Sequence, residues 1–309
     1  MKIVALAGGV GGAKLVYGFA QILKPGDLTV VVNTGDDFEH YGLYICPDLD
    51  TVCYSLANLA DPLTGWGRAG DTYQSLEEAI KLGGPDWFKI GNNDLGTHLE
   101  RTRRLKTGQK LSKITRDFCQ VWGINSRVIP MTDDKVSTIL ITAEMGELPF
   151  QEYFVHQKCQ PSIRAIKYSG ADKAKPVPEI INAIEEASLI VICPSNPWVS
   201  IDPILSVQGI KKAMNKKKVV VVSPIIQGKA LKGPAAKMFI ELGTEPSAEA
   251  VVDHYCDFIR GFVFDQLDIN LKSKIDQRGI ISYTTNTIMH NPTDKVRLAE
   301  KIINFSETI

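Results

Sequence analysis

Short, continuous runs of apolar and mostly β-branched residues constrain the fold of this chain more than any other feature. The runs are 2–6, 28–33, 127–129, 189–193, 218–223 and 262–264. Most of them lack the apolar–polar alternation of a half-exposed strand, so they are typical of a parallel sheet covered on both faces. Helical patterns separate or follow the runs, at 13–23, 178–187, 203–215 and 294–305. This order predicts an α/β fold with a Rossmann-like, doubly wound and mostly parallel sheet.

The interval 47–123 departs from this order, because it contains helical patterns and no convincing strand. Its candidate helices are 48–59, 72–82, 94–106 and 112–122. We therefore predict a helical insertion at 47–123 in a Rossmann-like nucleotide-binding core formed by 1–46 and 124–309. Residues 136–142 alternate apolar and polar side chains, which predicts an antiparallel edge strand.

Composition excludes several classes of partner. The chain has 309 residues, with 35 Lys and Arg against 35 Asp and Glu, so it lacks the broad positive field needed for nucleic acid or anionic membranes. No apolar stretch approaches the roughly 20 residues of a membrane-spanning helix. The six cysteines and five histidines are scattered, without zinc-ligand spacing. We expect a cytoplasmic protein with no nucleic-acid or membrane partner, reduced thiols and no catalytic histidine.

A glycine-rich loop joins the first predicted strand to the first predicted helix. Its residues are Gly8, Gly9, Val10, Gly11, Gly12, Ala13 and Lys14. Four glycines let the backbone approach a diphosphate, whose charge the helix N-terminal amides can bind, and Lys14 adds a cation. The spacing matches neither the P-loop nor the G-x-G-x-x-G fingerprint. A tight strand-to-helix turn is the alternative explanation, but a single glycine would supply one, so the loop favours phosphate binding.

The turn that follows the second predicted strand is acidic. It stands where dinucleotide-binding folds place a carboxylate that binds ribose. We take Asn33 and Asp36 as candidate nucleotide-binding residues. Asp37 is equally well explained as part of a solvated turn after Gly35.

Two carboxylates lie in the first turn of the helix predicted after Pro47. Asp48 is in the position of an N-cap, a structural role. Asp50 is not needed for that cap, so it is freer to hold Mg²⁺, which prefers one or two carboxylates together with phosphate oxygens.

A second polar loop follows the apolar run 189–193 and is bounded by two prolines, Pro194 and Pro197, which restrict its conformations. Ser195 and Asn196 in this loop can hydrogen-bond phosphate or guanine, and they face the same edge of the sheet as the glycine loop. Capping of the following helix is the alternative. The loop 223–229 follows the next apolar run, and the same two explanations apply to it.

Taken together, these segments resemble the 2-phospho-L-lactate transferase family. The resemblance is carried in chain order by 8–14, 33–37, 47–51, 66–67, 70–72, 95–98 and 194–197. It implies a magnesium-dependent transferase of coenzyme F-420 biosynthesis. Such an enzyme moves the 2-phospho-L-lactyl group, or an enolpyruvyl analogue, from lactyl-2-diphospho-5'-guanosine to 7,8-didemethyl-8-hydroxy-5-deazariboflavin. GMP leaves and coenzyme F-420-0 is formed.

The resemblance also implies roles for two residues of the insertion. The family's deazaflavin and metal contacts fall on Asp50 and on Lys89, which place the deazaflavin pocket in 47–123. Asp50 is then the candidate catalytic residue, acting through the metal or also as a base. A homodimer is the default expectation for a soluble enzyme.

Two other functions remain open at this point. A non-enzymatic regulator of the same fold that binds a nucleotide sugar would also keep the glycine loop, and a nicotinamide-dependent dehydrogenase would use that loop with Asp36. The helical insertion with Asp50 and Lys89 argues against the regulator, since it supplies a pocket for a second substrate, and the dehydrogenase rests on the glycine loop and Asp36 alone. Three donor chemistries, lactyl, enolpyruvyl and glyceryl, fit the sequence equally, and the residues that would specify guanine are not identified.

Overall fold

The computed structural model describes residues 1–309 and contains one large sheet of seven parallel strands. In spatial order these are β14 (Ile281–Thr285), β13 (Gly261–Asp265), β10 (Val219–Val222), β9 (Leu189–Ile192), β1 (Ile3–Ala7), β2 (Leu28–Val32) and β5 (Arg127–Pro130). Strand β1 pairs in parallel with β2 on one side and with β9 on the other, so the strand order reverses here. The predicted α/β fold with a Rossmann-like parallel sheet is confirmed.

The sheet separates two hydrophobic clusters. Along β1, Ile3 and Ala5 belong to one cluster, whereas Val4 and Leu6 belong to the other. This division follows from the strand period of two, which sends successive side chains to opposite faces. Because both faces are covered, the strands are apolar throughout, which is the pattern that the sequence shows.

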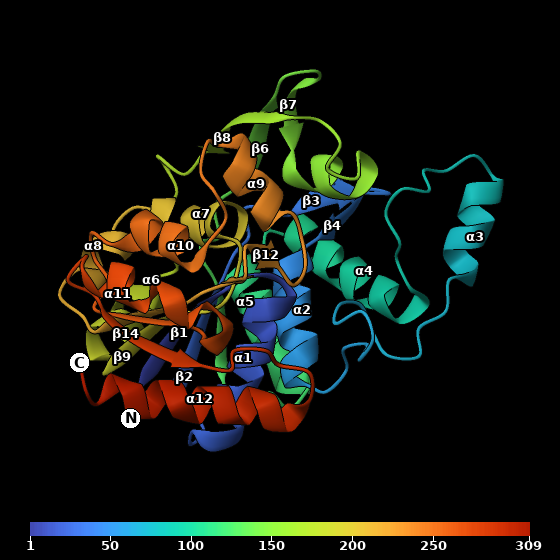
Figure 1. Cartoon of the computed structure of the whole chain (residues 1–309). Coiled ribbons are helices and arrows are strands. Elements are labelled where there is room, and N and C mark those ends of the chain that lie inside the picture. The colour runs from blue at the N-terminus through green and yellow to red at the C-terminus, as the bar shows by residue number, and fades with distance from the viewer.

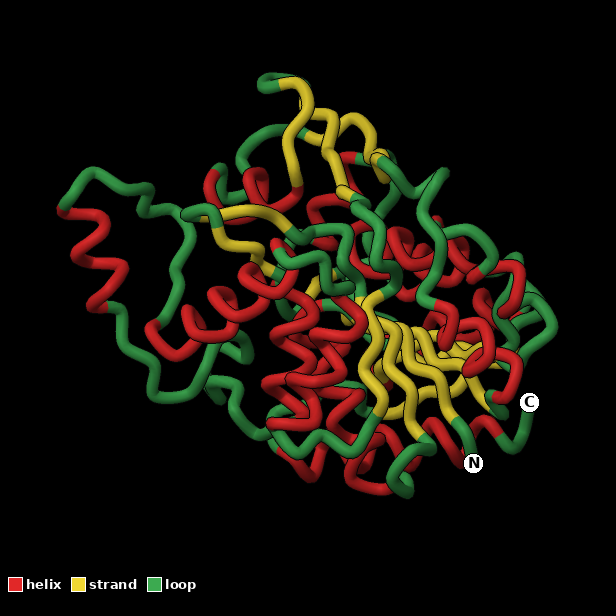
Figure 2. Tube along the Cα trace, turned by 180° about the vertical axis from the view of Figure 1, so that it is seen from behind, coloured by secondary structure: helices red, strands yellow, loops and turns green.

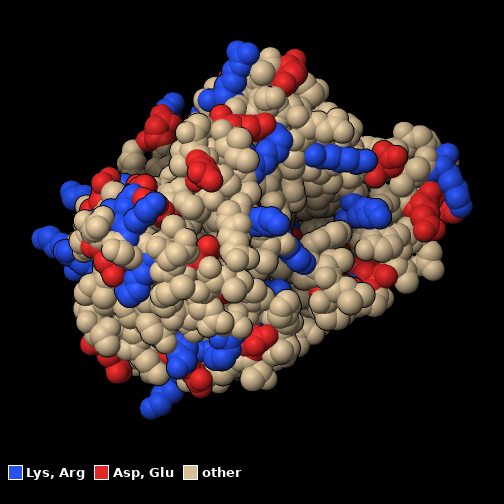
Figure 3. Space-filling view, viewed as in Figure 1, with Lys and Arg blue, Asp and Glu red and all other residues tan.

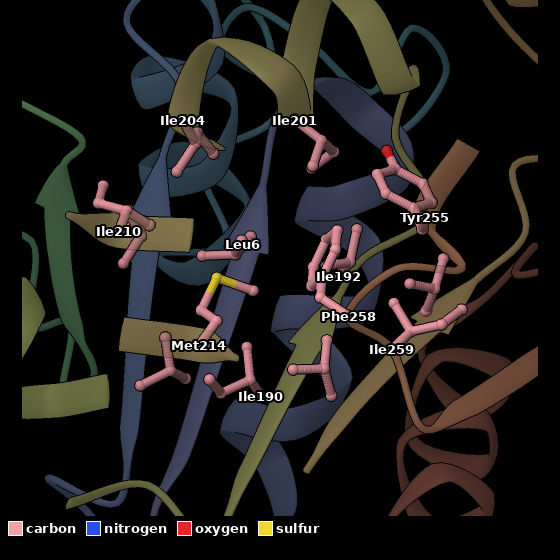
Figure 4. Packing of buried hydrophobic residues seen from close by; sticks show 14 of the residues in the cluster. Leu6, Ile190, Ile192, Ile201, Ile204, Ile210, Met214, Tyr255, Phe258 and Ile259 are labelled. Atoms are coloured by element: carbon pink, nitrogen blue, oxygen red, sulfur yellow. The ribbon is translucent and has the colours of Figure 1, made fainter. Parts of the chain in front are cut away.

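Helices cover both faces of the sheet (Figures 1 and 2). One face carries α1 (Gly9–Ile22), α2 (Pro47–Leu56), α5 (Leu111–Val121) and α12 (Pro292–Ser306). The other carries α6 (Pro178–Glu186), α7 (Asp202–Ser206), α8 (Ile210–Met214) and α10 (Ala248–Tyr255). Figure 4 shows the second layer, in which Ile204, Ile210 and Met214 pack close to Leu6 and Ile190 of the strands. The sheet is therefore doubly wound.

Two of the expected elements differ from the structure. Strand β14 is absent from the predicted runs, because it lies at the sheet edge with one neighbour, and its Ile-Ser-Tyr-Thr-Thr sequence is partly exposed. The single helix expected at 203–215 is wrong, since α7 and α8 are separate helices. Gly209, with φ 88°, precedes α8 in a left-handed conformation that favours glycine and interrupts the helix.

The segment 47–123 contains four helices at nearly the predicted positions. Besides α2 and α5 it includes α3 (Gln74–Lys81) and α4 (Asn92–Lys106). Helices α2 and α5 belong to the hydrophobic cluster of the sheet, whereas α3 stands away from the main body on long connections (Figures 1 and 2). The boundaries of the insertion, 47 and 123, stay a prediction.

A second, antiparallel sheet is formed by the part of the chain between β5 and β9 of the central sheet. Its strands are β7 (Gly146–Pro149), β6 (Ser137–Thr142) and β8 (Ile163–Ser169), in that spatial order. Strand β6 is antiparallel as predicted, but the edge position is wrong, because it pairs with β7 on one side and β8 on the other.

Smaller elements complete the chain. They are the hairpin β3 (Phe38–His40) and β4 (Leu43–Ile45), the pair β11 (Ile225–Ile226) and β12 (Lys229–Ala230), the helices α9 (Ala235–Glu241) and α11 (Lys272–Asp276), and the helical turns η1 (Glu152–His156), η2 (Pro197–Ile201) and η3 (Gln266–Leu271). None of the helices combines the length and apolar character that crossing a membrane requires.

Candidate active site

A cavity of about 1060 Å³ opens at the carboxyl edge of the central sheet. Loops that follow β1, β2, β9, β10 and β14 all contribute to its wall, together with α2, α4 and the segment after α3. It includes the point beside β1 where the strand order reverses, which is where open α/β sheets bind their ligands. Figure 3 shows a hollow between the main body and the segment with α3, with Lys and Arg side chains around its rim.

The glycine loop forms one end of this cavity. Helix α1 begins at Gly9, so the loop residues are themselves the N-terminal turn of the helix, whose first amides have no partner within the helix. Gly8, Gly9, Val10 and Gly11 line the cavity. Gly12 does not; a Cβ on Gly12 would lie 2.7 Å from the Ser195 hydroxyl oxygen, so this glycine serves close packing.

Asp48 binds the glycine loop and is not the N-cap of α2. The cap position is held by Cys46, and the expected capping role of Asp48 is wrong. Its carboxylate accepts hydrogen bonds from the Gly9 amide at 2.6 Å and from the Asn33 side chain at 2.9 Å. Burial raises the pKa of Asp48 to about 6, although these hydrogen bonds act in the opposite direction. The fold thus places a carboxylate directly at the N-terminus of α1.

The Asn33 side chain holds two carboxylates, Asp36 and Asp48, beside the glycine loop. Its amide nitrogen donates to Asp36 at 3.0 Å, to Asp48 and to the Val199 carbonyl oxygen, and its side chain is fully buried. It does not line the cavity, whereas Asp36 does. Gln151 donates to the second oxygen of Asp36 at 2.9 Å. Burial and the neighbouring Asp48 raise the pKa of Asp36 well above its ordinary value.

The second polar loop is joined to the glycine loop by Ser195. The Ser195 hydroxyl donates to the Gly8 carbonyl oxygen at 2.8 Å and accepts from the Gly8 amide at 3.3 Å. The Asn196 side-chain oxygen Oδ1 accepts from the Trp198 backbone amide at 3.1 Å and so caps the turn η2. Both Ser195 and Asn196 line the cavity. Lys14 also reaches it, and its ammonium group donates to the Met289 carbonyl oxygen at 2.8 Å.

Asp50 faces the middle of the cavity and forms a buried ion pair with Arg101 of α4. The Arg101 guanidinium donates to both carboxylate oxygens, at 3.0 Å for Oδ2. Arg101 is 3% exposed and Asp50 6% exposed, so each charge depends on the other inside the protein. The pair lies 51 residues apart in sequence.

His98 and Asp94 extend this network from α4. The His98 Nδ1 atom lies 3.3 Å from Arg101, and since a guanidinium only donates, Nδ1 is the acceptor and Nε2 holds the proton. Nε2 lies 3.4 Å from Asp94, which also accepts from the Tyr54 hydroxyl at 2.6 Å. Burial opposes ionisation of Asp94, but His98, the Tyr54 hydroxyl and the Arg101 charge together hold the pKa of Asp94 below its ordinary value. Asp94 is therefore a charged group in the cavity wall.

Aromatic side chains form the other end of the cavity, next to Lys89. Trp87 and Phe88 lie in the wall just before Lys89, and Phe150 and Phe154 lie in it from the region of η1. The Phe150 and Phe154 rings are stacked at 5.4 Å. A flat ring system fits between such side chains better than a sugar or a phosphate does.

The glycine loop with its neighbours, the residues around Asp50 and the aromatic side chains all line one cavity. Comparison with known proteins identifies the family of the chain. The family model described as 2-phospho-L-lactate transferase CofD matches residues 3–301. The chain belongs to the 2-phospho-L-lactate transferase family. It is therefore an enzyme, a transferase, and the resemblance given by the sequence motifs is confirmed.

Members of the 2-phospho-L-lactate transferase family match this chain along its whole length. A phosphoenolpyruvate transferase of Streptomyces coelicolor is 38% identical over 100% of this chain and 99% of its own. A 2-phospho-L-lactate transferase of Methanocaldococcus jannaschii is 38% identical over 98% of this chain and 97% of its own. A member of the UPF0052 family from Bacillus halodurans, of solved structure, has a TM-score of 0.62 and 16% identity over 98% of each chain, which shows a shared fold alone. The non-enzymatic alternative gains no support from these relatives.

Within this transferase the cavity unites ten of the twelve residues singled out from the sequence. Gly12 and Asn33 are the two that stand behind its wall; both hold the loops in place. Sequence reasoning missed Asp94, His98 and Arg101, all on α4. His98 was set aside because no second histidine lies at ligand spacing, yet the segment 95–98 already stood among the family motifs.

Proposed function

We propose that this transferase moves a 2-phospho-L-lactyl group, or its enolpyruvyl analogue, from a guanosine diphosphate-linked donor to 7,8-didemethyl-8-hydroxy-5-deazariboflavin, with release of GMP. The product is coenzyme F-420-0. One observation carries the proposal: the glycine loop, a group of aromatic side chains and the carboxylates of Asp36, Asp48, Asp50 and Asp94 all line a single cavity. A transferase for a charged donor and a flat acceptor needs these parts together.

The glycine loop and its neighbours support the donor end. The N-terminal turn of α1 and Lys14 both line the cavity, and a helix N-terminus beside a cation suits a diphosphate. Ser195 and Asn196 line the same cavity, and their hydrogen bonds to Gly8 and Trp198 hold the second polar loop beside the glycine loop.

The aromatic wall supports the acceptor end. Trp87, Phe88 and Phe150 offer ring faces and edges to a deazaflavin ring system, and stacking of this kind adds about 0.5–1.5 kcal/mol per pair beyond burial. Lys89 follows directly in the chain and can hydrogen-bond the polar edge of the ring. The ribityl chain would then extend toward Asp50 and Asp94 in the middle of the cavity.

The residues of the cavity fit a magnesium ion. Asp50, Asp94 and His98 each offer an atom within 4.8 Å of the others. Because the His98 Nε2 atom holds a proton that faces Asp94, it has no lone pair to offer a metal ion, which leaves Asp50 and Asp94 as the candidate ligands. Mg²⁺ prefers one or two carboxylates completed by phosphate oxygens. We propose that Asp50 and Asp94 hold the ion, which when bound neutralises charge on the donor phosphates.

The chemistry asked of the protein itself is mostly positioning. The ribityl hydroxyl oxygen forms a bond to the phosphorus that bears the lactyl group, and the bond from that phosphorus to the bridging oxygen breaks. GMP leaves with the electron pair of that bond, and its phosphate takes up the proton that the hydroxyl releases. Phosphoryl-type transfer needs little covalent help from side chains, so a nucleophilic triad is not required. Arg101 engages both oxygens of Asp50, and we therefore assign Asp50 to orienting the hydroxyl and the ion.

A direct assay tests the proposed reaction. The protein is incubated with the deazaflavin, Mg²⁺ and, in separate reactions, the lactyl, enolpyruvyl and glyceryl derivatives of guanosine diphosphate, and the products are weighed by mass spectrometry. We expect GMP and one phosphoester of the deazaflavin to appear together. Relatives of both lactyl and enolpyruvyl type are 38% identical to this chain, so only the assay distinguishes the donors. If no donor gives a product, the proposal is wrong.

We further propose that the enzyme is a homodimer in the cytoplasm. Homodimers are the commonest assembly of soluble enzymes. Sedimentation at several protein concentrations tests this, and a purely monomeric profile at micromolar concentration contradicts it.

A further inference from the structure

We propose that Lys232 is a second phosphate-binding cation, which together with Lys14 holds the donor diphosphate over the glycine loop. This inference rests on the proposed guanine-nucleotide donor and names a residue of its binding site. Lys232 lies in the connection between β12 and α9 and lines the same cavity.

The ammonium group of Lys232 lies close to the glycine loop. It donates a hydrogen bond to the Thr64 carbonyl oxygen at 2.5 Å, across 168 residues of sequence. A Cβ on the neighbouring Gly65 would lie 3.7 Å from this ammonium group and 2.6 Å from the Val10 side chain. Lys232, Gly65 and Val10 are thus in one place, and the lysine reaches over the N-terminal turn of α1.

Neither lysine has a carboxylate partner. Lys14 and Lys232 form no ion pair, and each ammonium group donates only to a backbone carbonyl, of Met289 and Thr64 respectively. Burial lowers the pKa of Lys14, and the positive charges of Lys232 and Lys295 lower it further. Lys295 lies over the Tyr17 ring outside the cavity wall, so Lys14 and Lys232 are the two cations that an anion in this end would meet.

A diphosphate in this end needs these cations, because the helix terminus alone does not suffice. The Gly9 amide already donates to Asp48, and Asp36 stands nearby, so two carboxylates flank the place where phosphate oxygens would bind. Two ammonium groups offset that repulsion. When the donor binds, Lys232 exchanges the Thr64 carbonyl oxygen for a phosphate oxygen.

Binding measurements with Lys232→Ala test the role. Guanosine diphosphate binding is measured by calorimetry and deazaflavin binding by its fluorescence. We expect the dissociation constant for guanosine diphosphate to rise about tenfold or more, the size expected for losing a hydrogen bond between charged groups, with deazaflavin binding unchanged. Lys232→Arg should keep most of the affinity. Lys229→Ala is the matched control, since Lys229 is an exposed lysine of β12, just before the connection that carries Lys232, and does not line the cavity.

The possible results separate the role of Lys232 from the proposed guanine-nucleotide donor. If Lys232→Ala binds guanosine diphosphate as tightly as the unchanged protein, or if deazaflavin binding weakens equally, the assignment is overturned while the proposed function stands. If the unchanged protein binds the deazaflavin but no guanosine diphosphate, the proposed donor itself is wrong. An unaltered melting temperature of Lys232→Ala without ligand shows that the fold is intact.

Discussion

Among single residues, the buried carboxylates show how this cavity distributes charge. Asp50 is paired with Arg101, whereas Asp48 and Asp36 have only amide donors, from Gly9, Asn33 and Gln151. A carboxylate with a guanidinium partner stays charged inside a protein, but one with only amide partners resists ionisation. The site therefore combines a carboxylate in a buried ion pair with two carboxylates, Asp36 and Asp48, whose pKa values burial raises.

Replacing Asp50 tests the buried ion pair. Asp50→Ala leaves the buried Arg101 without a carboxylate partner, so we expect the free energy of unfolding in urea to fall by about 3–5 kcal/mol and turnover to be lost at saturating substrates. Glu100→Ala is the control on α4, because it removes a solvent-exposed pair with Arg103 and should leave stability and turnover nearly unchanged. Normal turnover by Asp50→Ala would show that this view of the catalytic centre is mistaken.

Asp48 provides a prediction for pH dependence. Its folded-state pKa of about 6 lies above the ordinary 3.8, so the folded state binds more protons between these values and stability is lost as pH rises through 6. Asp48→Asn removes this ionisation. Relative to the unchanged protein, the variant should gain on the order of 1–3 kcal/mol of unfolding free energy between pH 4 and pH 7. Urea titrations at each pH measure the difference, and two parallel curves contradict the prediction.

At the level of elements, the close contact between the loop after β1 and the loop after β9 is the central feature. The Ser195 hydroxyl forms hydrogen bonds with both the amide and the carbonyl oxygen of Gly8. Gly11 and Gly12 lack the side chains that would otherwise keep the two loops apart. The glycines thus do two things: they allow the contact between loops, and they leave the backbone of the loop without side chains along the cavity wall. Sequence reasoning identified the second of these and not the first.

A pair of glycine substitutions separates these effects. A Cβ on Gly11 would overlap the Pro194 carbonyl oxygen, so Gly11→Ala should cost about 1–3 kcal/mol and weaken guanosine diphosphate binding at least tenfold. Gly96 lies within α4 and a Cβ there meets nothing within 4 Å, so Gly96→Ala should raise stability by about 0.5–1 kcal/mol. Thermal melts and calorimetry measure both. Equal behaviour of the two variants would contradict the role of the loop contact.

For the whole molecule, the arrangement of the cavity at the strand-order reversal predicts which nucleotides stabilise the fold. Guanosine diphosphate at one hundred times its dissociation constant should raise the melting temperature by about 5 °C, since binding to the folded state alone adds about 2.7 kcal/mol. NADH should produce no such shift, because the chain is a transferase and its glycine loop lacks the dinucleotide spacing. A larger shift with NADH than with guanosine diphosphate would contradict the proposed donor.

Local patterns in the sequence predict six of the seven strands of the parallel sheet, the helices of 47–123 and the loops at the carboxyl edge, because apolar periodicity and glycine placement are local properties. It could not place Arg101 beside Asp50, Asp48 on the Gly9 amide, or Lys232 over Val10. Those contacts join segments far apart in the chain, and their existence depends on how loops and helices pack in three dimensions. Only the tertiary structure decides which charges share a buried space, and that choice sets the chemistry of the site.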